Sequence, residues 1–183
     1  MCAAPQRVSM EKVDIDAVEQ AALSGPTDRR DLGRALGATD VAVMYYELDP
    51  GDKFSGGYHT HLDQEEIFLV LEGEAEFKTR EPPRGSEPAS GDAASEGAKL
   101  TVGAGEAIRF APGEFQTGYN HYDNDDPVRG LALGAPAGMD ETVSIVTCPD
   151  CGEEGEHDVD LDETGGVVTT TCRNCGFVIE TEP

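Results

Sequence analysis

The sequence predicts an all-β fold, either a barrel or a sandwich, followed by a small C-terminal unit organised by cysteines. From Val41 onward, short runs rich in β-branched and aromatic residues recur, separated by glycine or by proline-glycine pairs. No extended helical repeat of apolar residues interrupts these runs. Four of the five cysteines lie within residues 148–183. These three observations favour short strands around one core, with an appendage at the C-terminal end.

Residues 1–40 carry weaker patterns. Val13 and Ile15 alternate with acidic residues, as in a half-buried strand. Asp16–Leu23 predicts a short helix that ends at Gly25-Pro26. We therefore expect this segment to form an N-terminal extension that packs on the barrel.

The expected barrel spans residues 41–141. Glu72-Gly73 predicts a hairpin turn between its second and third strands. Residues 81–98 are rich in Gly, Ser, Pro, Ala and Glu, and they predict a long, exposed, acidic loop. The expected strands are residues 41–48, 66–71, 74–79, 100–102, 107–110, 115–119 and 128–133.

The charge balance excludes several classes of partner. The 183 residues include 13 basic and 37 acidic side chains, which gives a formal net charge of −24. Such a surface repels phosphate backbones and anionic lipids, so nucleic-acid and membrane binding are not expected. No apolar run approaches the ~20 residues of a membrane span, and residues 1–7 do not form a secretory signal. The hydrophobic content of 38% suffices for a modest core.

The acidic residues also suggest the solvent in which the protein works. Lysine is scarce, and Asp and Glu are spread along the whole chain, so the composition resembles proteins of extreme halophiles. At molar salt the Debye length falls to about 3 Å, which screens the mutual repulsion of like charges. The alternative is an acidic protein of an ordinary mesophile.

The first chemical motif is His59-Thr60-His61. On a strand, residues i and i+2 point to the same face, so both imidazoles would lie together. Glu65 or Glu66 follows within a few residues. Two neutral nitrogens and one carboxylate that converge on a barrel interior make a divalent-metal site.

These residues resemble the first motif of the cupin superfamily. That motif is H-x-H, three or four residues, E, six residues and G, and it is matched here by His59, His61, Glu66 and Gly73. The family spacing favours Glu66 over Glu65 as the ligand. The lead-in departs from the family, because Lys53 stands where the family has a glycine.

A second cupin motif follows further along the chain. It is G, five residues, P-x-G, two residues, H, three residues and N, and its framework is matched by Gly105, Gly113 and Asn120. Ala111 stands at the proline position. Gln116 stands at the histidine position, and its amide offers a carbonyl oxygen in place of an imidazole. The two motifs cover about residues 41–135.

The resemblance implies a double-stranded β-helix, or jelly-roll barrel, with one divalent transition metal such as Fe, Mn, Ni or Zn. The implied ligands are His59, His61 and Glu66, with Gln116 as a weaker fourth. The alternative is a cupin that has lost its metal and keeps the two histidines as hydrogen-bonded barrel residues.

Other side chains of the expected barrel have less certain roles. Phe68 and Val70 share the inward face of Glu66 by alternation. Glu65, where it is not a ligand, is either a general base or a solvated acid. Three aromatic residues either line the barrel mouth or pack, namely Tyr58, Phe110 and Tyr119.

The second chemical motif is a pair of C-x2-C-G turns. Cys148 and Cys151 are separated by twenty residues from Cys172 and Cys175. This spacing predicts a structural zinc with four cysteine ligands, and residues 146–183 resemble a zinc ribbon. Disulfides or a redox dithiol are the alternative, but the usual βαβ context is missing. His157 is expected at the surface rather than at the metal, and Cys2 is expected to be an inert terminal thiol.

Two functions follow from these motifs. The first is a mononuclear metal-binding cupin that acts on a small organic molecule, by dioxygenation or isomerisation. The second is a non-catalytic module that binds a small molecule, or a protein through the zinc ribbon. Thiolate-bound zinc fits a reducing compartment, so we expect a cytoplasmic protein. The family resemblance also suggests a homodimer.

Overall fold

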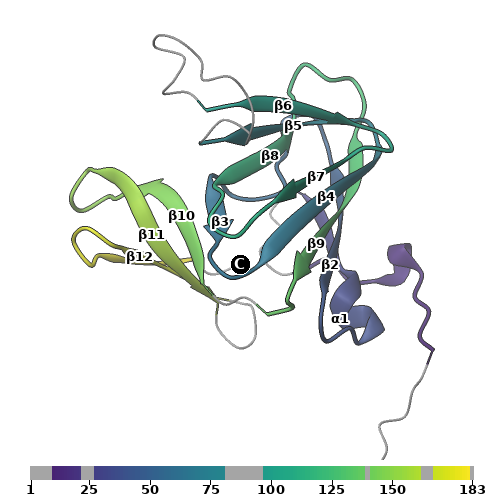
Figure 1. Ribbon diagram of the computed structural model, residues 1–183, viewed down its shortest axis with the longest axis horizontal. Coiled ribbons are helices and arrows are strands. Elements are labelled where there is room, and N and C mark those ends of the chain that lie inside the picture. Colours follow the sequence, from purple (N-terminus) through teal and green to yellow (C-terminus); the bar gives the residue numbers. More distant parts are fainter. Residues whose placement is uncertain (1–9, 22–26, 81–96, 139–140, 162–166, 182–183) are drawn as a thin grey trace, which may run out of the picture.

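The computed structural model describes residues 10–21, 27–80, 97–138, 141–161 and 167–181. The predicted all-β fold is confirmed (Figure 1). The elements are η1 (Ile15–Ala17), β1 (Asp28–Asp31), α1 (Leu32–Leu36), β2 (Ala42–Leu48), β3 (His59–His61), β4 (Glu65–Glu72), β5 (Glu74–Thr79), β6 (Lys99–Gly103), β7 (Ala107–Phe110), β8 (Gln116–Asn120), β9 (Val128–Ala135), β10 (Thr142–Thr147), β11 (Glu154–Leu161), β12 (Val168–Cys172) and β13 (Val178–Thr181).

The N-terminal segment differs from its prediction. The expected strand at Val13 and Ile15 is absent from the described residues, and the expected helix is reduced to the 3-10 turn η1. The reason is a long-range contact, because Arg30 donates a hydrogen bond to the carbonyl of Ile15 at 2.7 Å. Gln20 also forms a β-bridge with Arg30. These contacts connect the segment to β1, and residues 22–26 of the expected helix and its end lie outside the described residues.

Two antiparallel sheets form the fold. The first has the order β1-β2-β9-β4-β7, and the second has the order β13-β12-β11-β10-β3-β8-β5-β6. The part of the second sheet from β3 to β6 faces the first sheet and closes the barrel, as Figure 1 shows. The part from β10 to β13 continues beyond the barrel. Among the described residues, no helix has the length and apolar character that crossing a membrane requires.

Aromatic side chains fill the interior between the two sheets. Phe54, Phe68, Phe77 and Phe110 are each at most 5% exposed, and the rings of Phe68 and Phe77 lie 4.9 Å apart. Burying each such side chain stabilises the fold by about 1.5–3 kcal/mol. Val70 is also fully buried. The predicted inward face of β4 is therefore confirmed for Phe68 and Val70, while Phe110 packs in the core.

Glycines at two positions allow this packing. Gly73 has a φ of 79° in the turn between β4 and β5, where the sequence predicts a hairpin. On β8, a Cβ at Gly118 would collide with the ring of Phe77. The aromatic core therefore approaches the backbone of β8 directly.

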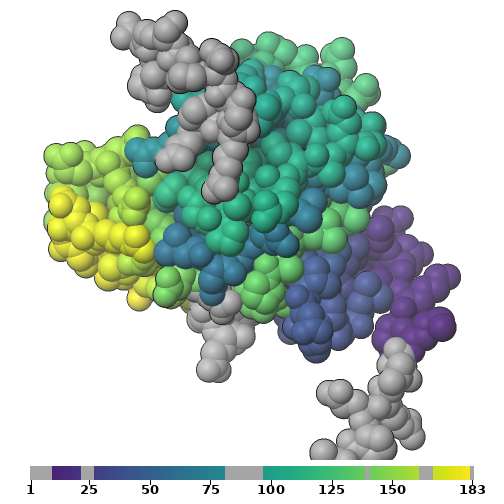
Figure 2. Space-filling view, in the orientation of Figure 1, coloured from purple at the N-terminus to yellow at the C-terminus, as the bar shows by residue number. Residues whose placement is uncertain are grey.

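The C-terminal unit, residues 142–181, is joined to the barrel by a shared strand. β10 pairs with β3 of the barrel on one side and with β11 on the other. The boundary expected between residues 141 and 146 therefore falls within β10. Figure 2 shows this unit, coloured yellow-green to yellow, against one side of the barrel.

Some sequence expectations lie outside the described residues. Cys2 is one of them, as are residues 81–96 of the expected acidic loop and the Thr164–Gly166 turn.

Candidate metal centres

The three predicted barrel ligands come together between the two sheets. His59 and His61 lie on β3, and Glu66 lies near the start of β4 in the opposite sheet. One ligand atom from each residue lies within 4.8 Å of the others. The side chains of His59 and Glu66 are 12% and 16% exposed, so the cluster is largely buried but still reaches solvent.

Each imidazole is oriented by a hydrogen bond at Nδ1. His59 Nδ1 lies 3.2 Å from the carbonyl oxygen of Gly57, which fixes that nitrogen as the donor. His61 Nδ1 lies 2.9 Å from the hydroxyl of Thr142 on β10. Histidines that bind metals have this arrangement, in which a partner at one ring nitrogen leaves the other nitrogen for the ion. The two rings are therefore oriented as ligands require.

Gln116 joins the same cluster from β8. Its side chain is fully buried, and its amide nitrogen donates to Glu66 Oε2 at 2.9 Å and lies 3.2 Å from His59 Nε2. The amide oxygen Oε1 has no hydrogen-bond partner within the described structure. A half-turn of the amide would direct this oxygen toward His59 and Glu66, where it could contact a cation.

Burial leaves both imidazoles of the cluster uncharged near pH 7 and makes the carboxyl group harder to ionise. It lowers the pKa of His59 to about 4, with a further contribution from His61. The pKa of His61 is lowered by the same cause. Burial raises the pKa of Glu66 to about 7, against the hydrogen bond from Gln116, which lowers it. Two uncharged imidazoles and a carboxyl group near its midpoint suit a divalent cation, which would favour the ionised carboxylate.

The structure separates the two candidate carboxylates. Glu65 faces away from the cluster and forms an ion pair with Arg109 of β7. Glu66 alone of the two approaches the histidines. Tyr58 and Tyr119 lie on the outer side of the second sheet, where the Tyr119 hydroxyl donates to Glu76 at 2.7 Å.

The four predicted cysteines form a second cluster, in the C-terminal unit. One sulfur atom from each lies within 4.8 Å of the others, and none is in a disulfide. Two equivalent turns present them, because Gly152 N donates to Cys148 O at 2.9 Å and Gly176 N donates to Cys172 O at 2.8 Å. Both glycines have a φ near 75°. Four thiols that converge in this way fit a tetrahedral zinc site.

His157 contradicts its prediction as a surface residue. It is 0% exposed on β11, its Nδ1 donates to the carbonyl of Gly155 at 2.9 Å, and its Nε2 has no partner among the described residues. The sequence carried a signal for this position. Acidic residues at 154, 156, 158 and 160 alternate with residues 155, 157 and 159, which places His157 on the opposite face from the acids.

One row of residues connects the two clusters across the second sheet. His59 pairs with Ser144, Ser144 pairs with His157, and His157 pairs with Cys172. Because paired residues on neighbouring strands share a face, these side chains lie on the same side of the sheet. Three strand spacings, about 14 Å, separate the backbones of β3 and β12.

Comparison with solved structures shows the fold. A sugar phosphate isomerase of the cupin superfamily from Silicibacter pomeroyi matches with a TM-score of 0.55 at 17% identity, over 94% of this chain and 92% of that one. A conserved protein with a double-stranded β-helix domain from Klebsiella pneumoniae matches with a TM-score of 0.51 at 18% identity, over 79% and 96%. A third protein, from Acidithiobacillus ferrooxidans and provisionally assigned as a sugar phosphate isomerase, has a TM-score of 0.50 at 16% identity, over 85% and 76%.

These identities establish the architecture alone. The predicted jelly-roll fold, a double-stranded β-helix, is confirmed by these matches. No protein-family model matches the sequence, and no curated protein matches it significantly.

Proposed function

We propose that the protein binds one divalent transition metal between its sheets and acts there on a small organic molecule. His59, His61 and Glu66 are the ligands, and Gln116 is a weaker fourth. The observation that carries this proposal is the convergence of the three ligand atoms within 4.8 Å. The Nδ1 partners of both imidazoles support it, because they leave a second nitrogen of each ring for the ion.

The donor set selects among metals. Two imidazoles with one carboxylate suit Fe, Mn, Ni or Zn and disfavour ions that prefer soft sulfur ligands. A metal at such a site supplies Lewis acidity and open coordination positions for substrate or O2. The buried aromatic core closes the inner side of the site to water. The partial exposure of His59 and Glu66 leaves a path for a substrate from solvent.

Isomerisation is the reaction class that the comparisons favour over dioxygenation. The Silicibacter pomeroyi protein is a sugar phosphate isomerase, and the Acidithiobacillus ferrooxidans protein carries the same provisional assignment. Both share only the fold with this chain, so the reaction is a hypothesis to be tested on aldose and ketose phosphates.

The cysteine cluster is proposed to be a structural zinc ribbon. Its four thiols leave no open position at a tetrahedral ion, so zinc there would contribute to folding rather than to a reaction. A reducing, cytoplasmic environment would keep the thiols available. The ribbon also offers a surface for a protein partner, and a homodimer remains the expected assembly.

A non-catalytic binding module is the second candidate function. The inward neighbours of the proposed ligands on β4 and β7 are Phe68 and Phe110, and neither exchanges a proton near pH 7. A site that only binds a small molecule needs no such group, which favours this alternative.

Elemental analysis of the purified protein separates the two proposals. Two metals per chain, one zinc with one Fe, Mn, Ni or second Zn, support the metal-dependent enzyme. One zinc alone supports the binding module. Proton NMR of sugar phosphates incubated with the two-metal protein then tests for isomerisation, with the His59→Ala/His61→Ala variant as the inactive control.

A further inference from the structure

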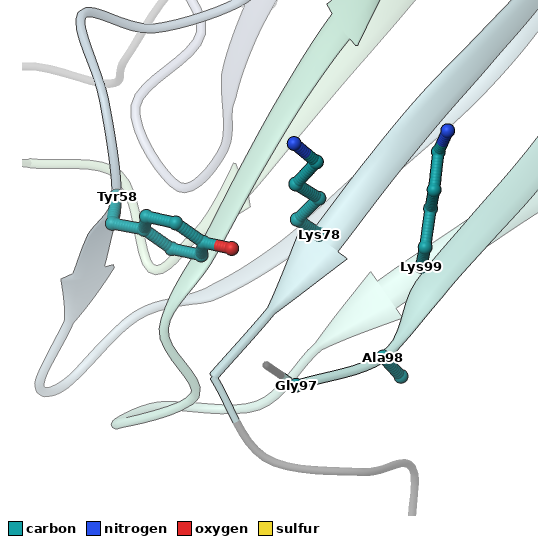
Figure 3. A pocket seen from close by; sticks show the side chains of 5 residues that line it. All are labelled: Tyr58, Lys78, Gly97, Ala98 and Lys99. Atoms are coloured by element: carbon teal, nitrogen blue, oxygen red, sulfur yellow. The ribbon is translucent and has the colours of Figure 1, made fainter. Parts of the chain in front are cut away.

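A pocket lies on the outer face of the barrel, away from the proposed metal ligands. It encloses about 360 Å³ and is lined by Tyr58, Lys78, Gly97, Ala98 and Lys99 (Figure 3). Lys78 follows Phe77 on β5, and Phe77 is buried in the core. Since successive side chains of a strand point to opposite faces, the cavity and the core lie on opposite sides of this sheet.

The two lysines of the pocket bring like charges together. Lys78 on β5 is directly opposite Lys99 on β6 in the antiparallel register. Figure 3 shows both side chains extending in the same direction, with the hydroxyl of Tyr58 turned toward Lys78. Like charges directly opposite each other on neighbouring strands destabilise a sheet. An anion between or above them would reverse this repulsion.

The nearest carboxylate does not neutralise both charges. Glu76 accepts from Lys99 Nζ at 2.6 Å and from the Tyr119 hydroxyl at 2.7 Å. Lys78 Nζ lies 5.2 Å from the centre of the Tyr119 ring, and no carboxylate within the described residues pairs with it. Among the residues that the structure describes, the positive charge of Lys78 is therefore not compensated by a carboxylate.

The pocket departs locally from the acidic composition of the chain. The chain has four lysines, and two of them, Lys78 and Lys99, line this one pocket. The net charge of the whole chain is −24, so a positive charge at this place would attract an anion that the protein as a whole repels.

Tyr58 adds a hydrogen-bond donor to the charges. A phenol is protonated at neutral pH, so its hydroxyl is available as a donor. A protonated hydroxyl can donate to an oxygen of a bound anion. This hydrogen bond would orient the anion, whereas the lysines mainly contribute positive charge.

We propose that the outer cavity binds a small molecule that carries a phosphate or carboxylate group. Lys78 and Lys99 supply the charge, and Tyr58 donates a hydrogen bond. The cavity volume is at the lower end of the range for small-molecule sites, which begins at about 300 Å³. The site is separate from the barrel metal, so it does not depend on the function proposed above.

The test is calorimetric titration of the full chain with inorganic phosphate and, in a second arm, with citrate. One saturable site is expected in at least one arm, with affinity that falls as KCl is raised. Lys78→Gln should weaken binding by about tenfold or more, because charge-assisted contacts are lost, and Lys78→Arg should largely restore it. Lys53→Gln is the matched control, since it removes a lysine outside the cavity, and should change affinity by less than about twofold.

A second variant locates the binding. The His59→Ala/His61→Ala protein should bind phosphate or citrate as the unmodified chain does, because the cavity is on the other face of the sheet. Loss of binding in this variant would assign the anion to the barrel metal instead. The absence of saturable binding in both arms, or an equal loss in Lys53→Gln, would each overturn the proposal.

Discussion

The two candidate metal-binding clusters both include residues of the second sheet, and they are assembled in different ways. The cysteine cluster takes its ligands from two short turns, in which residues three apart supply two sulfurs each. The barrel cluster takes His59, Glu66 and Gln116 from three strands in two sheets. The ligands of the cysteine cluster are close together in the sequence, so an ion bound there can drive the surrounding chain to fold. The barrel cluster exists only after the fold has brought distant strands together.

The difference implies that the barrel cluster depends on the C-terminal unit more than the cysteine cluster depends on the barrel. β3, which carries both histidines, pairs with β10 at three positions and with β8 at one. Additional backbone hydrogen bonds from Ile145 N to Tyr58 O and from Leu62 N to Glu141 O extend the contact with the C-terminal unit. The strand that carries both histidines is therefore held in place by β10, which leads into the cysteine cluster. The following predictions test this dependence.

The largest effect is expected from Cys172→Ser. This buried ligand should be required for zinc, and structural zinc contributes apparent binding energies of about 10–16 kcal/mol to small domains. We expect loss of the zinc, unfolding of β11–β13 seen by hydrogen exchange, and a weaker barrel metal site because β10 loses a neighbour. Cys2→Ser should retain zinc. Unchanged barrel-metal affinity in the zinc-free Cys172→Ser protein would show that β3 is positioned without the C-terminal unit.

The converse change should leave the cysteine cluster intact. His59→Ala/His61→Ala removes two proposed ligands, so barrel-metal affinity should fall by more than the roughly 100-fold typical of losing a partner that orients a ligand. The zinc content should remain one per chain by elemental analysis. Retention of a second metal would contradict the ligand assignment.

A smaller loss is expected when only the contact between the two parts is changed. Thr142→Val removes the hydroxyl at 2.9 Å from His61 Nδ1 while it preserves side-chain shape. Barrel-metal affinity should fall by about 10–100-fold, without loss of zinc. Thr101→Val on β6 is the matched control, and calorimetric titration with Mn²⁺ measures both. Equal affinities in the two variants would mean that Thr142 does not orient the imidazole.

Acidity should affect the barrel site before it affects the fold of the barrel. Because the pKa of Glu66 is raised from 4.5 to about 7, the metal must displace a proton below that pH. Metal affinity should fall about tenfold for each pH unit below 7 and level off above it. The same shift means that the metal-free protein loses stability as pH rises from about 4.5 to 7. Glu66→Gln should bind metal weakly, with this pH dependence removed.

Salt should have the smallest effect, and it should stabilise the C-terminal unit more than the barrel. Residues 148–183 contain ten acids and one base, a charge of 1 − 10 = −9, which leaves −24 + 9 = −15 for the other 147 residues. The C-terminal unit is thus more highly charged for its size. Raising KCl from about 0.1 M to about 1 M should raise the melting temperature, with the larger gain in protection of β11–β13. Full stability in dilute buffer would argue against adaptation to high salt.

Local patterns predicted most of the barrel. Glu74–Thr79 is a strand exactly as its residues indicate, and the H-x-H spacing located two of the clustered side chains. The choice of Glu66 over Glu65 depended on the family spacing, and the structure places Glu66 inward through strand alternation. These features depend on neighbours in the chain.

Contacts between distant residues explain what the sequence did not show. The turn at η1 accepts a hydrogen bond from Arg30, fifteen residues away, and no local sequence pattern predicts this hydrogen bond. The double pairing of β10 joins residues 59–61 to residues 142–144, across most of the barrel. The burial of His157 follows from that extended sheet, even though the alternation of acids around it was visible.

The shared strand β10 also determines where the chain can be shortened. A protein that ended at residue 141 would leave β3 as an edge strand, with unpaired backbone N–H and C=O groups along residues 58–62. Exposed edges of this kind recruit strands from other molecules and promote self-association. The C-terminal unit therefore covers an edge of the barrel, and a chain shortened to residue 141 should self-associate more readily than the full chain.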